Sequence, residues 1–304
     1  QFPRDEYDRI SSKSFFQYIC GNVGLAQTRI HLSSYDSVGD GHLREFDLEN
    51  YVFELIPTLS LFTALSENFI PFYVFTAVRK FLFFLDPKKT GRVPVNQVVG
   101  SRVMAELQAL RSDKWSEASN QANWFSAGNA LRVYSQYLEL DTDMNGMLSK
   151  SELLQYGSGT LTQTFVDRVF QECLTYGGEM DFKTFLDFVL AMENRTSAAS
   201  MQFLFRLLDI NRQGYLDAFT INYFFRDVLR RMMQAGQEPI NPLDVLSEIF
   251  DMVAPEDPAR ITFADLRRSK TGHTVLHILI DVQGFWQYDN REALQASSEP
   301  EEMF

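Results

Sequence analysis

Hydrophobic residues recur along most of this chain at the three- and four-residue spacing of amphipathic helices. In the segment MDFKTFLDFVLAMEN, residues 180–194, the apolar side chains that share one helical stripe are Phe182, Phe185, Leu186, Val189 and Leu190. Alternating patterns typical of half-buried strands are scarce. The sequence therefore predicts an all-α protein.

Short Asp- and Gly-containing stretches interrupt the helical pattern, each followed by one apolar residue. This arrangement is typical of EF-hand helix-loop-helix units, in which the residue two after the turn glycine forms a small β-bridge with a partner loop. The six bridge residues are Leu43, Val93, Leu148, Met180, Leu216 and Ile261. EF-hands bury their open faces in pairs, so we pair 43 with 93, 148 with 180, and 216 with 261. The predicted fold is an elongated array of paired, mostly degenerate EF-hands.

The pairing suggests a domain organisation. We expect a degenerate pair in 1–110, a central pair in 111–195, a second degenerate pair in 196–290, and an acidic, disordered tail in 291–304. The polar stretch 111–123 is the predicted boundary between the first two pairs. An exposed helix is an equally good interpretation of that stretch.

The most apolar segment, 69–85, has two interpretations. Pro71 and the pair Arg79 and Lys80 interrupt it short of the ~20 apolar residues that a membrane-spanning helix needs. It is therefore either the buried core of the first hand pair, which we favour, or a helix face that contacts a partner.

Composition narrows the function classes. The apolar fraction of 45% and the 27 Phe predict a packed, globular chain. The net charge of −12 disfavours nucleic acids and anionic membranes as partners. The two cysteines, Cys20 and Cys173, fit a reducing, cytoplasmic compartment. Because the sequence opens at Gln1, we expect a fragment or a processed product.

One loop, DTDMNGMLSKSE at 141–152, has the complete EF-hand pattern. Calcium takes six to eight hard oxygen ligands, which a twelve-residue loop supplies around a glycine at position 6. Gly146 fills that position, and Ser149 at position 9 would act through a water. The predicted Ca²⁺ ligands are the side chains of Asp141, Asp143 and Asn145, the backbone carbonyl of Met147, and both carboxylate oxygens of Glu152.

The other loops lack parts of this pattern. The partner loop, 173–184, offers no ligand set. Loops 36–47 and 209–220 keep some acids but lack a glutamate at position 12, so either is at most a weak site. Loop 86–97 and the loop around Ile261 are expected to be scaffold. We therefore expect one site, with a sensor-range dissociation constant of roughly 10⁻⁷ to 10⁻⁵ M.

Enzyme motifs are absent from the sequence. There is no P-loop or dinucleotide fingerprint, and Gly157-Ser158-Gly159 lacks the frame of a serine nucleophile elbow. His273 and His277 would share a helical face, but no Glu follows His273 as in a zinc protease, so we expect packing or surface roles. No catalytic residues are predicted.

Several ordered segments resemble a known family, the B-double-prime regulatory subunits of protein phosphatase 2A. The similarity covers about 69–292 and is strongest to the gamma-type branch that includes the plant TONNEAU/FASS proteins. The segments that carry it are FLFFLDP, DTDMNGMLSKSELLQYGSGTLT, MDFKTFLDFVLAMEN, FLFRLLDI, GYL, FFRDV, FDMVAPEDPARITFADL and LIDVQGFWQYDNRE. In larger family members the hand equivalent to 209–220 also holds calcium, whereas here Gln213 and Thr220 break it.

The resemblance implies a non-catalytic subunit that docks on the helical-repeat scaffold and catalytic subunits of the phosphatase and directs it to phosphoprotein substrates. It also implies a cytoplasmic location, at centrosomes or cortical microtubules, and sometimes a nuclear one. Two other classes of function remain as alternatives. A free calmodulin-like sensor would need several cooperative sites. A calcium-dependent enzyme would need catalytic residues that the sequence lacks.

Overall fold

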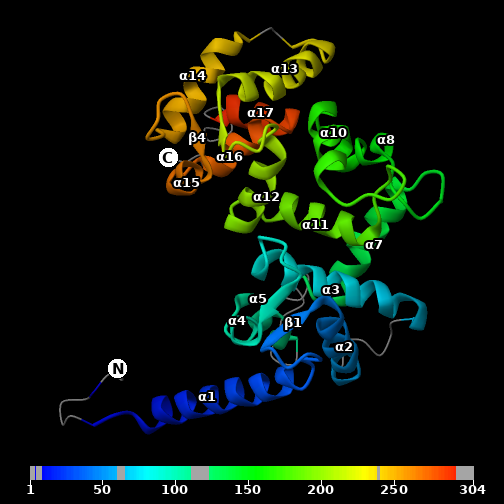
Figure 1. The fold of residues 1–304 in the computed structure, drawn as a ribbon, viewed down its shortest axis with the longest axis vertical. Helices are drawn as coiled ribbons and strands as arrows, with labels where there is room; N and C mark the ends of the chain where they lie inside the picture. The colour runs from blue at the N-terminus through cyan, green and yellow to red at the C-terminus, as the bar shows by residue number, and fades with distance from the viewer. Residues whose placement is uncertain (1–3, 5–8, 60–65, 111–122, 238–239, 292–304) are drawn as a thin grey trace, which may run out of the picture. The chain divides into compact units, whose positions relative to one another are not determined.

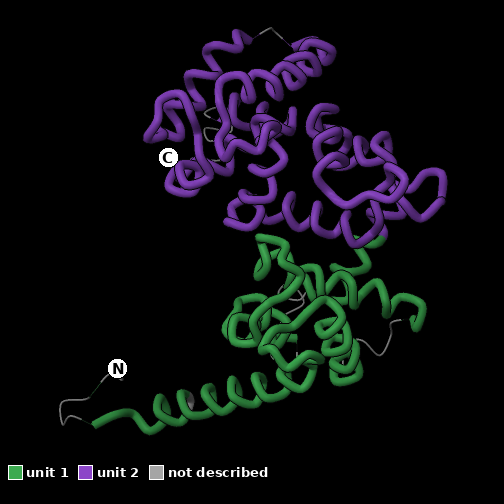
Figure 2. The backbone as a smooth tube through the Cα atoms, viewed as in Figure 1, with its two compact units in different colours: residues 1–134 green, residues 135–304 purple. Residues whose placement is uncertain are grey.

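We describe a computed structural model of the chain, covering residues 4, 9–59, 66–110, 123–237 and 240–291. The described chain is mostly helical, with two small two-stranded sheets, which confirms the predicted all-α class (Figure 1). It separates into two compact units, 1–134 and 135–304 (Figure 2). Residues 111–122 of the predicted boundary at 111–123, and residues 292–304 of the predicted tail at 291–304, lie outside the described residues. The division into three hand pairs stays a prediction.

The first unit contains two helix-loop-helix hands. Its elements are α1 (Ser12–Ser33), β1 (His42–Arg44), α2 (Glu45–Leu55), η1 (Ile56–Thr58), η3 (Glu67–Phe69), α3 (Ile70–Leu85), β2 (Arg92–Pro94), α4 (Val95–Val99) and α5 (Arg102–Ala109). Strands β1 and β2 pair antiparallel with Leu43 opposite Val93. The first predicted pairing is confirmed.

The apolar helix α3 forms the core of this unit. The helical segment Glu67–Leu85, which joins η3 to α3, is long and apolar enough to cross a membrane by composition alone, but more than half of it is buried inside the fold. Tyr73, Val78 and Phe81 are almost fully buried. Lys80 is also buried, and its ammonium lies 2.6 Å from the carboxylate of Glu106. Of the two interpretations of 69–85, burial is confirmed.

Helix α7 (Ala127–Leu140) leads into the second unit. The following elements are α8 (Lys150–Leu153), α9 (Tyr156–Gly159), α10 (Gln163–Glu172), α11 (Phe182–Glu193), α12 (Ala198–Leu208), β3 (Tyr215–Leu216), α13 (Ala218–Gln234), α14 (Pro242–Val253), β4 (Ile261–Thr262), α15 (Phe263–Arg268), α16 (Gly272–Ile278) and α17 (Val282–Asp289). Leu148 bridges Met180, and Leu216 pairs with Ile261. The remaining two predicted pairings are confirmed.

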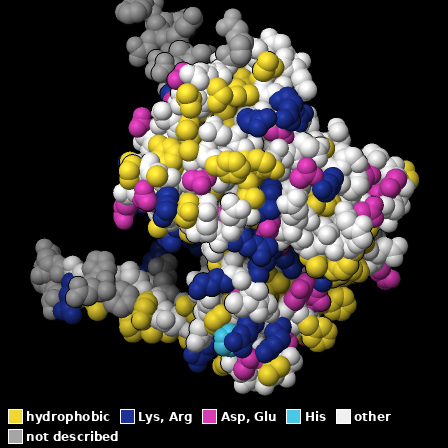
Figure 3. All heavy atoms as spheres, turned by 45° about the horizontal axis from the view of Figure 1, so that its top comes forward, with side chains coloured by type: hydrophobic (Ala, Val, Ile, Leu, Met, Phe, Trp, Pro, Cys, Tyr) yellow, Lys and Arg dark blue, Asp and Glu magenta, His cyan; other side chains and the backbone are white. Residues whose placement is uncertain are grey.

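Aromatic side chains fill the core of the second unit. The stripe predicted on 180–194 is buried, with Phe185 and Leu186 inaccessible to solvent, as is the neighbouring Phe188. The Tyr137 ring lies 5.2 Å from Phe185, so the helix that precedes the intact loop packs on the helix that follows its partner loop. On the surface, hydrophobic side chains are scattered among charged ones over the visible face (Figure 3). The loop 141–152 therefore follows a helix, α7, that packs against α11.

Candidate metal centre

The intact loop, 141–152, connects α7 to α8 and is organised by its first acid. One carboxylate oxygen of Asp141 accepts the amide N–H of Asn145 at 3.1 Å, and the other accepts that of Gly146 at 2.9 Å. Gly146 has a φ of 79°, which an L side chain rarely adopts. Asp141 thus closes the turn on which the predicted ligands sit.

The last acid of the loop, Glu152, is held at the start of α8. One oxygen of its carboxylate accepts the N–H and the hydroxyl of Thr142, both at 2.8 Å. The other accepts the N–H and the hydroxyl of Ser149, also at 2.8 Å. Ser149 and Glu152 form a capping box, in which each side chain bonds the other's backbone. The local sequence therefore fixes the orientation of this carboxylate.

Hydrogen bonds keep the buried carboxylate of Glu152 charged. Burial alone would raise its pKa, since water stabilises the charged form, and the side chain is only 6% exposed. The hydrogen bonds from Ser149 and Thr142 outweigh burial and lower the pKa to about 2. Glu152 is therefore an anion at neutral pH.

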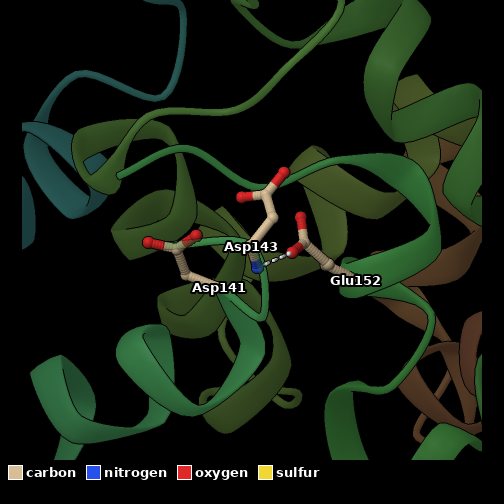
Figure 4. A group of neighbouring side chains, drawn as sticks. All are labelled: Asp141, Asp143 and Glu152. Atoms are coloured by element: carbon tan, nitrogen blue, oxygen red, sulfur yellow. Dashed lines mark hydrogen bonds between the residues drawn. The ribbon is translucent and has the colours of Figure 1, made fainter. Parts of the chain in front are cut away.

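The structure brings three of the predicted ligands together. Asp141, Asp143 and Glu152 each offer a carboxylate oxygen, and these atoms lie within 4.8 Å of one another (Figure 4). Among the described residues, no lysine or arginine pairs with any of the three. Three carboxylates at this spacing repel one another, and hard oxygen donors are the ligands that Ca²⁺ prefers. The donor set fits a divalent cation.

The other two predicted ligands, Asn145 and Met147, lie on the same loop but outside the group of three carboxylates. The side-chain oxygen of Asn145 accepts the N–H of Met147 at 2.7 Å, and its amide nitrogen donates to Asp143 at 3.1 Å. Met147 follows the turn glycine directly, with its side chain outside the core. Neither residue belongs to the carboxylate cluster, so their assignment as ligands stays a prediction.

Two supporting residues were missed from the sequence. Glu179, from the partner loop, accepts a hydrogen bond from the Asn145 amide at 3.1 Å. The buried hydroxyl of Tyr137 donates to the carbonyls of Gly146 at 2.8 Å and of Met180 at 3.3 Å. Burial, followed by the charges of nearby acids that include Asp181 and Asp141, raises the pKa of Tyr137. Tyr137 could have been identified from the sequence, because it is an aromatic residue four positions before the first acid of the loop.

Two degenerate loops keep the turn although they lack the ligand set. Asp86 accepts the N–H groups of Thr90 and Gly91 at 2.9 and 2.7 Å, and Asp209 accepts those of Gln213 and Gly214 at 3.0 and 2.7 Å. The residues before these turns, Lys89 and Arg212, have positive φ like Met144 in the intact loop. The position-1 acid is thus a structural residue in all three loops.

In two other loops, arginine side chains form ion pairs with the acidic residues. In loop 36–47, Arg44 bonds Asp40 at 2.8 Å, and Arg92 lies 3.6 Å from the same carboxylate. In the last loop, Arg268 bonds Asp265 at 2.7 Å. A guanidinium there neutralises charge that a cation would otherwise neutralise. A weak site at 36–47 stays untested, but Arg44 and Arg92 would compete with an ion.

The fold and the site define a helical EF-hand protein with one complete loop, and comparison with known proteins identifies its family. No family model matches. The chain is 56% identical to the B'' gamma regulatory subunit of serine/threonine-protein phosphatase 2A of Xenopus tropicalis over 295 residues, 97% of this chain and 66% of that protein. The Homo sapiens protein of the same description is 56% identical over 96% of this chain and 65% of its own length.

A more distant relative carries a similar description, and a solved structure has a similar fold. TON2 of Arabidopsis thaliana, described as a probable B'' regulatory subunit of the same phosphatase, is 41% identical over 97% of this chain and 63% of its own length. A solved chain described as a PP2A PR70 holoenzyme superposes with a TM-score of 0.76 at 22% identity, over 84% of this chain and 96% of that chain, and shows the same fold.

The chain belongs to the B'' family of protein phosphatase 2A regulatory subunits, with the gamma subunits and TON2 among its relatives. The predicted resemblance is confirmed. The chain spans 63–66% of the length of these curated relatives.

Proposed function

We propose that this protein is a non-catalytic, calcium-binding regulatory subunit of protein phosphatase 2A. The observation that carries the proposal is the 56% identity to B'' gamma subunits across almost the whole chain. The carboxylates of Asp141, Asp143 and Glu152 supply the calcium part of the proposal. Bound calcium would neutralise these charges and cross-link the two ends of the loop.

The proposed partners are the scaffold and catalytic subunits of the phosphatase, with phosphoproteins as the substrates to which it is directed. Family membership supports this assignment. The location at centrosomes or cortical microtubules, in the cytoplasm or in the nucleus, rests on the family resemblance alone and is proposed on that basis.

A free calmodulin-like sensor is the alternative. Sensor hands that open a target groove work with cooperating ions in paired loops. Here the intact loop is bridged by Leu148 and Met180 to loop 173–184, which carries Cys173 and Thr184 at the end positions. A single complete ligand set in this hand pair favours the regulatory-subunit function.

Reconstitution from purified components tests the proposal. The chain is mixed with a phosphatase 2A scaffold–catalytic core in calcium or in chelator, and co-elution is measured by size-exclusion chromatography. We expect a complex, and no phosphatase activity from the chain alone. Asp141→Asn with Glu152→Gln should weaken the complex or change its calcium dependence without abolishing it.

A matched control removes two exposed acids outside the loop, Glu139→Gln with Asp251→Asn, and should leave the complex unchanged. Failure to bind the core in both calcium and chelator would contradict the proposal and favour the free sensor. Turnover by the pure chain that a single acid substitution removes would instead favour an enzyme.

A further inference from the structure

A pocket in the second unit lies away from the metal centre. It has a volume of about 600 Å³ and lies between the end of α11, α14, α16 and α17. This size is within the range of small-molecule sites. Its polar lining includes Arg195, Thr271, His273, His277, Tyr288 and Arg291. No carboxylate lines it among the described residues.

His277 is the unusual residue of this pocket. The sequence predicts a packing or surface role, and the side chain is indeed buried, at 4% exposure. However, neither ring nitrogen has a hydrogen-bond partner in the described part of the chain. Buried polar groups are almost always paired, because an unpaired one costs free energy. A fold that keeps such a histidine at a pocket wall leaves hydrogen-bonding capacity for a ligand.

The protonation state of His277 defines that capacity. Burial, then the positive charge of Arg195 and the neighbouring His273, lower the pKa of His277 to about 3. The imidazole is neutral at pH 7, so it offers one N–H donor and one acceptor nitrogen. A ligand group that carries negative charge would oppose the effect of Arg195 on this ring.

Two guanidinium groups give the pocket its charge. The Arg195 side chain is 41% exposed and lies 3.8 Å from Asp281, a buried residue that also caps α17 through the N–H of Gln283. The Arg291 side chain is 44% exposed and lies 3.3 Å from Glu248, which also accepts the Tyr288 hydroxyl. Each arginine has five N–H donors and therefore keeps donors beyond these contacts.

We propose that this pocket binds an oxyanion, the carboxylate or phosphate group of a ligand. Arg195 and Arg291 attract the charge, and the buried imidazole of His277 donates its N–H to one oxygen. Arginine is well suited to such groups because its planar donors match two oxygens at once. The site is independent of the calcium loop and of the proposed phosphatase role.

Titration with simple anions tests the proposal. Inorganic phosphate and succinate are added separately to the chelator-treated protein, with chloride at matched ionic strength as the reference. The readouts are the ring nitrogen NMR signals of His277 and the melting temperature. We expect at least one oxyanion, but not chloride, to shift the His277 signals, raise its pKa and raise the melting temperature. The anion that binds more tightly shows whether the pocket prefers a phosphate or a carboxylate group.

Variants separate a ligand site from simple packing. Arg195→Gln should weaken anion binding tenfold or more, whereas Arg267→Gln, an exposed residue on α15 outside the pocket, should have no effect. His277→Phe should remove the anion-induced shift in melting temperature while the unliganded protein stays at least as stable. Unshifted His277 signals with both anions, or equal weakening by Arg267→Gln, would overturn the proposal.

Discussion

Leu148 and Met180 exchange two backbone hydrogen bonds, each 2.8 Å long, in the only β-bridge between the intact loop and its partner among the described residues. On one side of this bridge lies a cluster of three carboxylates, and on the other a loop without a ligand set. The hand pair is thus complete as a fold unit but has only one complete ligand set.

Removing the carboxylate of Glu152 should remove the calcium site. We expect Glu152→Gln to abolish the tightest binding while the helices stay folded, because only one oxygen is exchanged. Isothermal titration calorimetry should find one ion per wild-type chain. For a site of about 10 μM, 1 mM calcium would raise the free energy of unfolding by about 2.7 kcal/mol. Glu139→Gln is the control, and two equivalent wild-type sites would contradict the prediction.

Stability in the absence of calcium should depend on pH through Glu152. Its pKa in the folded chain, about 2, lies below the ordinary value of 4.5, so its stabilising contribution is present above pH 4.5 and is lost as pH falls towards 2. The contribution is on the order of 2 kcal/mol. The difference in unfolding free energy between wild type and Glu152→Gln, measured by urea titration, should shrink over this interval. A constant difference would exclude this linkage.

Replacing Gly146 with alanine should strain the turn. Gly146→Ala places a side chain at a φ of 79°, where no neighbouring atom obstructs a Cβ, so the cost is backbone strain of about 1–2 kcal/mol. The matched control is Gly128→Ala on α7, which also has open space and no positive φ, and should be neutral or stabilising. Thermal unfolding in chelator measures both. Equal effects of the two substitutions would exclude the turn as the cause.

The hydroxyl of Tyr137 should couple the loop to its partner. Tyr137→Phe removes the bonds to the carbonyls of Gly146 and Met180 and should cost about 1–2 kcal/mol. It should also weaken calcium binding, since the loop backbone is less restrained. Tyr223→Phe, at a half-exposed ring on α13, is the control. Unchanged stability and affinity in Tyr137→Phe would show that the helices alone position the loop.

Much of the candidate metal centre could be predicted from the sequence, because its carboxylates and turn glycine lie within twelve consecutive residues. The bridge residues were predicted for the same reason, since each follows its turn at a fixed spacing. Glu179 and Tyr137 were missed because they reach the loop from the partner hand and from the preceding helix. The contact of Glu179 depends on how the two hands pack, which loop spacing does not encode, whereas Tyr137 at least stands at a fixed spacing before the first acid of the loop.

The sequence by itself determined the helical class, the three pairings of bridge residues and the one loop with the full EF-hand pattern, because these features follow from local periodicity and residue spacing. Only the tertiary structure decided that α3 is buried, that Arg44 and Arg92 neutralise Asp40, and that His277 lies unpaired at a pocket wall. Burial and charge pairing depend on residues brought together from distant positions in the chain. The environment that sets a side chain's charge therefore exists only once the helices have packed.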